Sequence, residues 1–176
     1  MEEFLKYWLR WTPVEHLIQQ NAWAWPMFET MHFIGIALLV GIVGMFDLRL
    51  LGFAKGIPVS ALRRLLPWGV LGCIITFVTG LLFVTGIYAN IEINPFIVAM
   101  SDGYLQMKLL FIALAGINLL AFYMTGVSKE VDKVGAGMDA PPLAKFNAFM
   151  SLFLWFGVIY FGRLIVWGSF TSYVGQ

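Results

Sequence analysis

The chain has 176 residues, of which 60% are hydrophobic and only 12% are charged. Soluble domains carry roughly 25% charged residues, so this composition excludes an ordinary soluble fold and predicts an integral membrane protein. The formal net charge of +1 comes without a basic stripe, which argues against a nucleic-acid partner. Cys73 is the one cysteine, so an internal disulfide and cysteine-based zinc or iron–sulfur sites are excluded within the chain.

The first 22 residues are expected to form a separate amphipathic segment at the membrane surface. They contain two short apolar stripes and several aromatic residues, but no continuous apolar region typical of a cleavable signal peptide. Within them, "TPVE" at 12–15 matches a capping box, in which Thr12 would cap a helix and Glu15 would reach back. Two short interfacial helices are therefore predicted before the first span.

Residues 23–176 are predicted to form an all-α bundle of four transmembrane helices. Four apolar runs are long enough to cross a bilayer, which takes about 20 residues. They cover about 26–53, 66–88, 104–125 and 143–170. Helix punctuation supports these limits, since "SDG" at 101–103 can open the third helix and Gly126 can close it.

The distribution of lysine and arginine predicts the orientation of the bundle. The loop between spans one and two and the loop between spans three and four are rich in these residues, whereas the segment 89–103 has none. Because positive charge favours the cytoplasmic side, both charged loops are expected in the cytoplasm. Both termini would then face the periplasm of a bacterium, with the protein in the inner membrane.

Four ionisable side chains are predicted to share one level on the periplasmic side. Glu29 and His32 lie on one face of the first span, because they are three residues apart. Lys108 and Arg163 lie at a similar depth on the third and fourth spans. Ionisable groups at membrane depth usually face the bundle interior and pair, so Glu29 is expected to pair with Lys108, Arg163 or both. The group forms either a structural ion-pair cluster or a cofactor site.

A second polar layer is expected on the cytoplasmic side and is interpreted as structural. Asp47 and Arg49 end the first span, and Asn118 lies at a comparable height on the third. A hydrogen bond between Asp47 and Asn118 is therefore predicted across two helices.

His32 leaves several chemistries open. It is either a hydrogen-bonded core imidazole or a metal or haem ligand. A b-type haem would take His32 as an axial ligand, with Lys108 or Arg163 near its propionates and His16, a methionine, a partner subunit or nothing as the second ligand. A quinone headgroup is the related alternative. Copper(I) held by Met27, Met31 and His32 is expected less, and a di-iron site is rejected because a second Glu-x-x-His element is missing.

Several stretches, in order, resemble an uncharacterised family of bacterial four-helix inner-membrane proteins. They are "WPMFETMHFIGIALLVG", "DLRLLG", "LPWGVLG" with "TGLLF", "KLLFIALAGIN" and "GRLIVW", which together extend from Trp25 to Trp167. The arrangement is more loosely similar to the copper-resistance D-like and b-type-cytochrome membrane families, which usually carry more histidines in their spans. The resemblance implies that Glu29, His32, Asp47, Arg49, Lys108, Asn118 and Arg163 occupy characteristic polar positions.

Two functions are favoured by these residues. The first is a redox subunit that binds haem or quinone and exchanges electrons with a partner complex. The second is an accessory subunit without chemistry that assembles with sister copies or with other membrane or periplasmic subunits, in contact with membrane lipid. A transporter is less favoured because four spans are few for alternating access. A hydrolase or transferase is favoured least, since no nucleophile–base pair is apparent.

Overall fold

The described structure, a computed structural model, covers residues 11–91 and 95–165, and it is helical without any strand in those ranges. The helices are α2 (Thr12–Gln20), α3 (Ala24–Leu51), α4 (Val59–Arg63), α5 (Leu66–Ile91), α6 (Pro95–Ser101), α7 (Gly103–Met124), α8 (Val127–Val131) and α9 (Pro142–Leu164). The first predicted surface helix and the end of the fourth predicted span lie outside the described residues. Within them, the all-α fold class is confirmed.

The four longest helices, α3, α5, α7 and α9, are long and apolar enough to cross a membrane. Their limits agree with the four predicted spans to within a few residues wherever the structure describes them. With 28 residues, α3 extends for about 42 Å, more than the roughly 30 Å of a hydrocarbon core. These helices indicate a multi-pass membrane protein.

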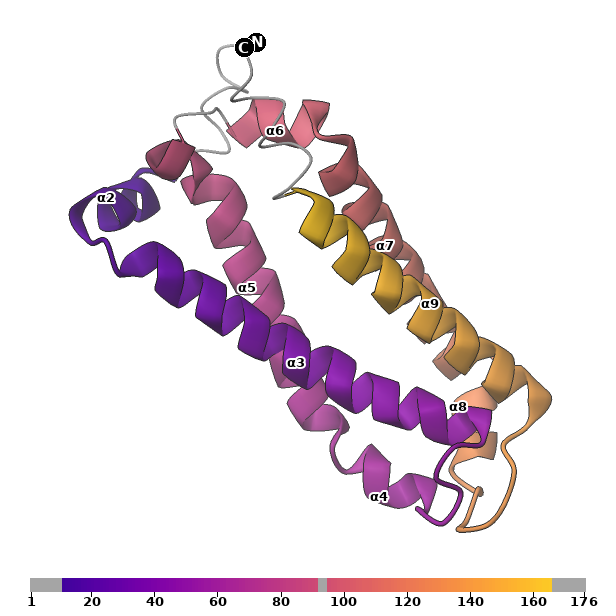
Figure 1. Cartoon of the computed structure of the whole chain (residues 1–176). Coiled ribbons are helices and arrows are strands. Elements are labelled where there is room, and N and C mark those ends of the chain that lie inside the picture. The colour runs from indigo at the N-terminus through magenta and orange to yellow at the C-terminus, as the bar shows by residue number, and fades with distance from the viewer. Residues whose placement is uncertain (1–10, 92–94, 166–176) are drawn as a thin grey trace.

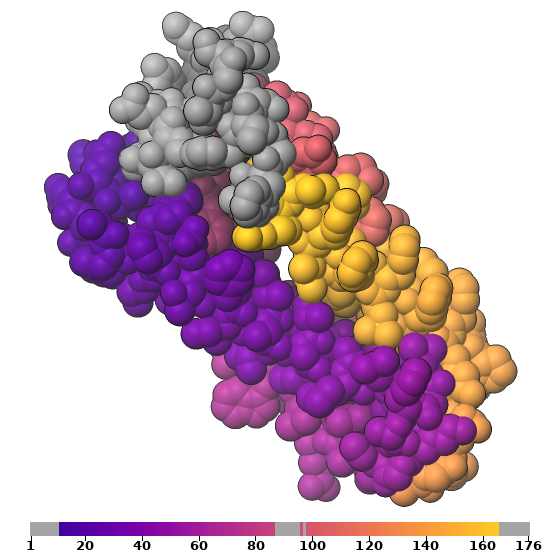
Figure 2. Space-filling model, viewed as in Figure 1, coloured from indigo at the N-terminus to yellow at the C-terminus, as the bar shows by residue number. Residues whose placement is uncertain are grey.

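The four long helices are arranged as two hairpins (Figure 1; Figure 2 gives the space-filling view from the same side). One hairpin pairs α3 with α5, the other pairs α7 with α9, and α3 also contacts α9. At the end where α3 finishes and α9 begins, the hairpins come together. At the opposite end, where α3 begins and α9 finishes, those two helices stand apart in Figure 1. We call these the loop end and the His32 end.

Small residues bring the helices of each hairpin close together. A Cβ atom added to Gly72 of α5 would lie 2.7 Å from both the Gly35 carbonyl oxygen and the Leu39 nitrogen of α3. In the other hairpin, Gly157 of α9 leaves room for the Phe111 ring of α7. Because lipid tails are as apolar as the helices, such close packing replaces the hydrophobic effect as a source of association.

The loop end contains the larger buried apolar cluster, which we call the loop-end core. Its members come from α3, the short helices α4 and α8, and α9, with one residue from α7. They are Phe46, Leu50, Val59, Leu62, Phe122, Val127, Val131, Val134, Ala140, Ala144 and Ala148. This core joins the two hairpins, whereas a smaller cluster at the His32 end (Val14, Ile18 and Ala24) joins α2 to the first hairpin, at the start of α3 and at Leu82 of α5.

Helix caps agree with the sequence in part. The Asp102 carboxylate caps α7 as predicted, accepting hydrogen bonds from the backbone nitrogens of Tyr104 at 2.9 Å and Leu105 at 3.1 Å. The predicted capping box at 12–15 is wrong, because the cap of α2 is Trp11 and no side chain bonds there. Glu15 is instead buried, since the face of α2 that carries Val14 packs on α5 at Gly86.

Replacing Gly72 by Ala is expected to destabilise the α3–α5 hairpin by about 1–3 kcal/mol, because the new methyl group would overlap backbone atoms that cannot move independently. The midpoint of thermal unfolding in detergent measures the change. Gly41→Ala is the matched control, since a Cβ atom on Gly41 of α3 meets nothing within 4 Å. Equal midpoints for the two variants would contradict the close approach.

Candidate functional site

His32 is a buried ionisable side chain at the His32 end, with 8% of its surface exposed. It lies on the face of α3 that packs against α5. Its Nδ1 atom lies 2.7 Å from the Thr79 hydroxyl oxygen of α5. The imidazole is therefore anchored between the two helices of one hairpin rather than turned toward lipid.

The hydrogen bonds of Thr79 favour one position for the imidazole proton. A threonine hydroxyl has one hydrogen, and carbonyl oxygens of its own helix accept it, Ile75 at 2.7 Å and Thr76 at 3.2 Å. The Thr79 oxygen then accepts from His32, so Nδ1 bears the hydrogen and Nε2 bears the lone pair. This assignment follows from the hydrogen-bond network. It is the form in which a histidine coordinates a metal, with its other ring nitrogen donating to an outer partner.

Aromatic rings surround the imidazole. The Phe83 ring of α5 meets His32 edge-on with centroids 5.2 Å apart, and Trp25 lies 5.3 Å from Phe83. Gly80 lets the histidine lie close to α5, since a Cβ atom there would be 3.7 Å from His32 Cε1. The ring is thus fixed in orientation by one hydrogen bond and by packing on one side.

Lys108 of α7, which was expected at the same depth as His32, lies toward His32 in the structure. The two side chains are close enough to interact electrostatically. The end of the lysine side chain lies against α9, where a Cβ atom on Gly162 would be 3.5 Å from Nζ. Lys108 is half-buried, and none of the described residues accepts a hydrogen bond from its ammonium group. Its charge is therefore available for an anionic ligand.

The predicted pairing of Glu29 with Lys108 or Arg163 is wrong. Glu29 is exposed and accepts a hydrogen bond from Trp25 Nε1 at 3.2 Å, one turn earlier on the same helix. Arg163 is also exposed, near the end of α9. The reason is rotational: the face of α3 with His32 packs on α5, and Glu29 lies at the outer edge of that face.

The other residues that were proposed to bind a metal together with His32 are exposed, whereas His32 is buried. His16 is exposed on α2, whose buried residues are Val14, Glu15 and Ile18. Met27 and Met31 are exposed on α3, whereas His32 is buried. This is not the arrangement that a three-ligand copper(I) site needs. Within the described ranges, moreover, no three histidine, cysteine, aspartate or glutamate residues are grouped as a metal site.

The polar layer at the loop end differs from the predicted one. The hydrogen bond between Asp47 and Asn118 is not formed. Asn118 of α7 instead pairs with Asn147 of α9, whose side-chain nitrogen donates to the Asn118 carbonyl oxygen at 3.0 Å and to its Oδ1 at 2.9 Å. Asp47 faces the Ser151 hydroxyl of α9. The pairing differs because α7 packs mainly on α9, and α3 meets α7 at Phe46 and Phe122 rather than at Asp47 and Asn118.

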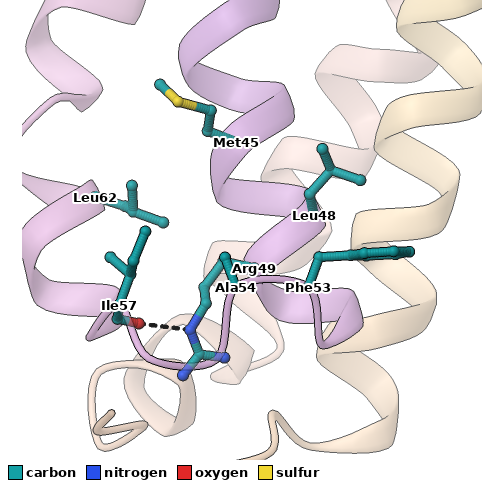
Figure 3. Close-up of a pocket in the computed structure, with 7 residues that line it drawn as sticks. All are labelled: Met45, Leu48, Arg49, Phe53, Ala54, Ile57 and Leu62. Carbon is teal, nitrogen blue, oxygen red and sulfur yellow. Dashed lines mark hydrogen bonds between the residues drawn. The ribbon is translucent and has the colours of Figure 1, made fainter. Parts of the chain in front are cut away.

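Arg49 connects the two charged loops, as Figure 3 shows in part. Only 1% of its surface is exposed. Its Nε donates to the Ile57 carbonyl oxygen at 2.6 Å, and its Nη2 donates to the carbonyl oxygens of Gly135 at 3.0 Å and Met138 at 3.2 Å. Ile57 belongs to the loop after α3, and the other two belong to the loop before α9. A cavity of about 220 Å³ lies beside it, walled mainly by apolar side chains such as Met45 and Leu62.

Ion pairs surround this connection at the membrane surface. Asp139 pairs with Lys55 at 2.9 Å and with Lys145 at 3.0 Å. Arg63 of α4 pairs with Asp132 at 2.9 Å and also donates to the Ser128 hydroxyl at 3.0 Å. The Lys55–Asp139 and Arg63–Asp132 pairs join the first hairpin to the region between α7 and α9, whereas Lys145 and Asp139 both belong to the second hairpin. The loop end is therefore a structural junction, in agreement with the structural interpretation of Arg49.

Sequence reasoning missed Thr79, which orients His32. Thr76 and Thr79 are hydroxyl residues in the middle of a predicted span whose other residues are mostly glycine and apolar residues. Their spacing of three places both on one helix face, so a search for hydroxyl groups at histidine depth could have found them. The reciprocal pair of Asn118 and Asn147 had a similar signal, since both are amides inside predicted spans.

Comparisons with protein-family models, with curated proteins and with solved structures give no match. The family resemblance seen in the sequence therefore stays a prediction. The function has to be argued from the geometry of the two polar regions.

Arg49→Ala is expected to lower the stability by about 3 kcal/mol, because the side chain that joins the two loops through three hydrogen bonds to carbonyl groups would be removed. Arg49→Lys should recover only part of this loss, since a lysine cannot donate as a planar fork. Unfolding midpoints in detergent measure both effects. Arg64→Ala, at an exposed neighbouring arginine, should stay within about 0.5 kcal/mol of the unchanged protein. A similar effect of both alanine variants would refute the connecting role of Arg49.

The ion pairs of Asp139 are expected to make stability depend on acid pH. Hydrogen bonds from Lys55 and Lys145 lower the pKa of Asp139 from 3.8 to about 2. Because the folded state binds this proton less readily than the unfolded state, the contribution is complete above pH 3.8 and is lost as the pH falls toward 2. Unfolding midpoints of the unchanged protein and Asp139→Asn should therefore differ at neutral pH and converge near pH 2. A constant difference would contradict the assignment.

Proposed function

We propose that this chain is a small multi-pass subunit of a bacterial inner membrane that binds a b-type haem through His32 and transfers electrons with a partner complex. The observation that carries the proposal is a pair of unsatisfied groups at the His32 end. His32 Nε2 carries a lone pair, and the nearby Lys108 ammonium group has no acceptor among the described residues. A ligand with a metal centre and carboxylate groups could bind His32 Nε2 through its metal and the Lys108 ammonium group through a carboxylate.

The residues present fit such a ligand. A haem-ligating histidine needs its second nitrogen held by an outer hydrogen bond, and Thr79 provides this. The propionates of haem need cations, and Lys108 comes from the other hairpin. When bound, the haem would supply the one-electron chemistry. The protein would supply one axial ligand, the orientation of that ligand and a positive charge.

His32 offers this site a single histidine ligand among the described residues, because His16 is exposed on α2. A second axial ligand would then come from a partner subunit or a second copy of the chain. This requirement agrees with an assembly in which the bundle works beside other membrane or periplasmic subunits.

A quinone is the second candidate, and the same two groups favour it. His32 Nε2 can accept a hydrogen bond from a quinol hydroxyl, and Lys108 can donate one to a quinone oxygen. Such a headgroup needs no further ligand from a partner. The two candidates differ in absorption, since only haem gives a reduced-minus-oxidised difference spectrum in the visible range.

The orientation is part of the proposal. The lysine and arginine residues of the loop end include Arg49, Lys55, Arg63, Arg64, Lys129, Lys133 and Lys145, whereas the lysines and arginines in the described part of the His32 end are Lys108 and Arg163. The positive-inside rule then places the loop end in the cytoplasm and His32 near the periplasmic surface. A periplasmic electron partner could approach His32 from that side.

The test is to purify the protein from its native membrane and to record difference spectra, pyridine haemochrome and quinone content. His32→Ala should abolish the haem bands, and Lys108→Gln should weaken haem retention. His16→Ala, at the exposed histidine, should leave the haem bands and haem retention unchanged. Thr79→Val should keep the fold but lower haem affinity by about 10–100-fold.

Haem bands that persist in His32→Ala would refute the ligand assignment. A colourless protein that copurifies with quinone, and loses it in both His32→Ala and Lys108→Gln, would establish the quinone alternative. A protein with neither cofactor would leave the accessory-subunit function.

A further inference from the structure

Asp47 is a carboxyl group buried between α3 and α9, far from His32. It is 5% exposed, and its Oδ2 atom is covered and has no hydrogen-bond partner among the described residues. Its one polar neighbour is the hydroxyl of Ser151 on α9, which is 8% exposed. The site lies on the α3–α9 contact that joins the two hairpins, next to Phe46 and Ala148 of the loop-end core.

Charged groups on every helix packed against α3 are directed elsewhere. Arg49, two residues away, donates to backbone carbonyls of the two loops. On α9, Lys145 pairs with Asp139, and Arg163 lies at the far end of the helix. Arg63 of α4 pairs with Asp132 and Ser128.

The other helices packed on α3 contribute no cation near Asp47 either. The segment Leu66–Ile91 that forms α5 contains no charged residue, and α2 packs at the His32 end. The lysine of α7, Lys108, lies toward His32 instead. On α3 itself, Glu29 and His32 lie at least 15 residues away, about 22 Å along the helix axis. Lys55 is engaged with Asp139. Asp47 is thus enclosed with one hydroxyl and without a counter-charge in the described structure.

An ionised carboxylate in such a place is unfavourable. Burial removes its hydration, and only a cation or several hydrogen-bond donors could replace the lost interactions. Ser151 supplies one donor, and the second oxygen has none. Taking up a proton removes the charge and leaves a neutral acid, which is far cheaper to bury.

We propose that Asp47 and Ser151 form a proton-binding site inside the membrane, in which Asp47 holds one proton as a carboxylic acid between the two hairpins. The proton is exchanged with water, as –COOH giving –COO⁻ and H⁺, only when α3 and α9 separate enough to hydrate the group. The site does not depend on a cofactor at His32.

The proposal predicts a direction for the effect of pH. The folded protein binds a proton at Asp47 that the separated, hydrated hairpins release more readily, so the α3–α9 contact weakens as the pH rises. Asparagine has the same shape as the neutral acid but cannot titrate. Asp47→Asn should therefore keep the contact and remove this dependence.

Infrared difference spectroscopy of the full-length protein in lipid vesicles tests the site. The unchanged protein at neutral pH should show the C=O stretching band of a protonated carboxyl group, and Asp47→Asn should lose it. Asp139→Asn is the matched control, because Asp139 is exposed and paired with two lysines. It should leave the band in place.

Ser151→Ala provides a second, independent test in which Asp47 is kept. It should shift the frequency of the band, because the acid loses its hydrogen-bond partner. Absence of a protonated-carboxyl band from the unchanged protein, or a band that survives in Asp47→Asn, would overturn the proposal. So would a band that Ser151→Ala leaves unmoved.

Discussion

The hydrogen bonds of one buried guanidinium group carry the association of the two hairpins. In lipid, apolar helices gain little from contact with one another, so helix association depends on close packing and on polar bonds. Arg49 donates three such hydrogen bonds to carbonyl groups in loops of both hairpins. The loop-end core then packs around this junction, in which Arg49 Nη1 is buried without a partner among the described residues. Without Arg49, the carbonyl groups of Ile57, Gly135 and Met138 would lose this donor.

The two ends of the bundle therefore have different roles. Around the loop end, charges are paired with charges or with carbonyl groups, as Asp139 and Arg63 illustrate. Toward the His32 end, the imidazole is oriented by Thr79, but no hydrogen-bond partner of its second nitrogen or of the Lys108 ammonium group lies among the described residues. Proteins usually satisfy ionisable groups at membrane depth, so unsatisfied ones favour a ligand. This contrast supports placing the proposed cofactor at His32 rather than at Arg49.

Asp47 belongs to neither pattern. It lies close to the structural junction along the chain, yet no cation of the junction reaches it in the described structure. A buried carboxyl group whose polar neighbour is one serine stabilises the fold little when ionised, and burial favours its protonated form. If both proposals hold, one bundle carries a redox group near one membrane surface and a proton near the other.

The sequence alone determined which segments are helices and which residues are polar inside them. Apolar length, the Asp102 cap and the position of Gly126 predict the spans closely, because hydrocarbon allows a single chain few ways to satisfy its backbone. The depth of each polar residue follows from the rise per residue, so His32 and Lys108 were correctly expected at one level.

What only the tertiary structure decided is which helix faces which, and how each is rotated. Glu29 lies three residues from His32, yet one side chain is exposed and the other is buried. Asn118 meets Asn147 rather than Asp47, because α7 packs on α9. Near-uniform apolar spans carry no strong face preference in their sequence. Their rotation is therefore set by the glycine contacts and by the few hydrogen bonds between helices, which exist only once the helices have met.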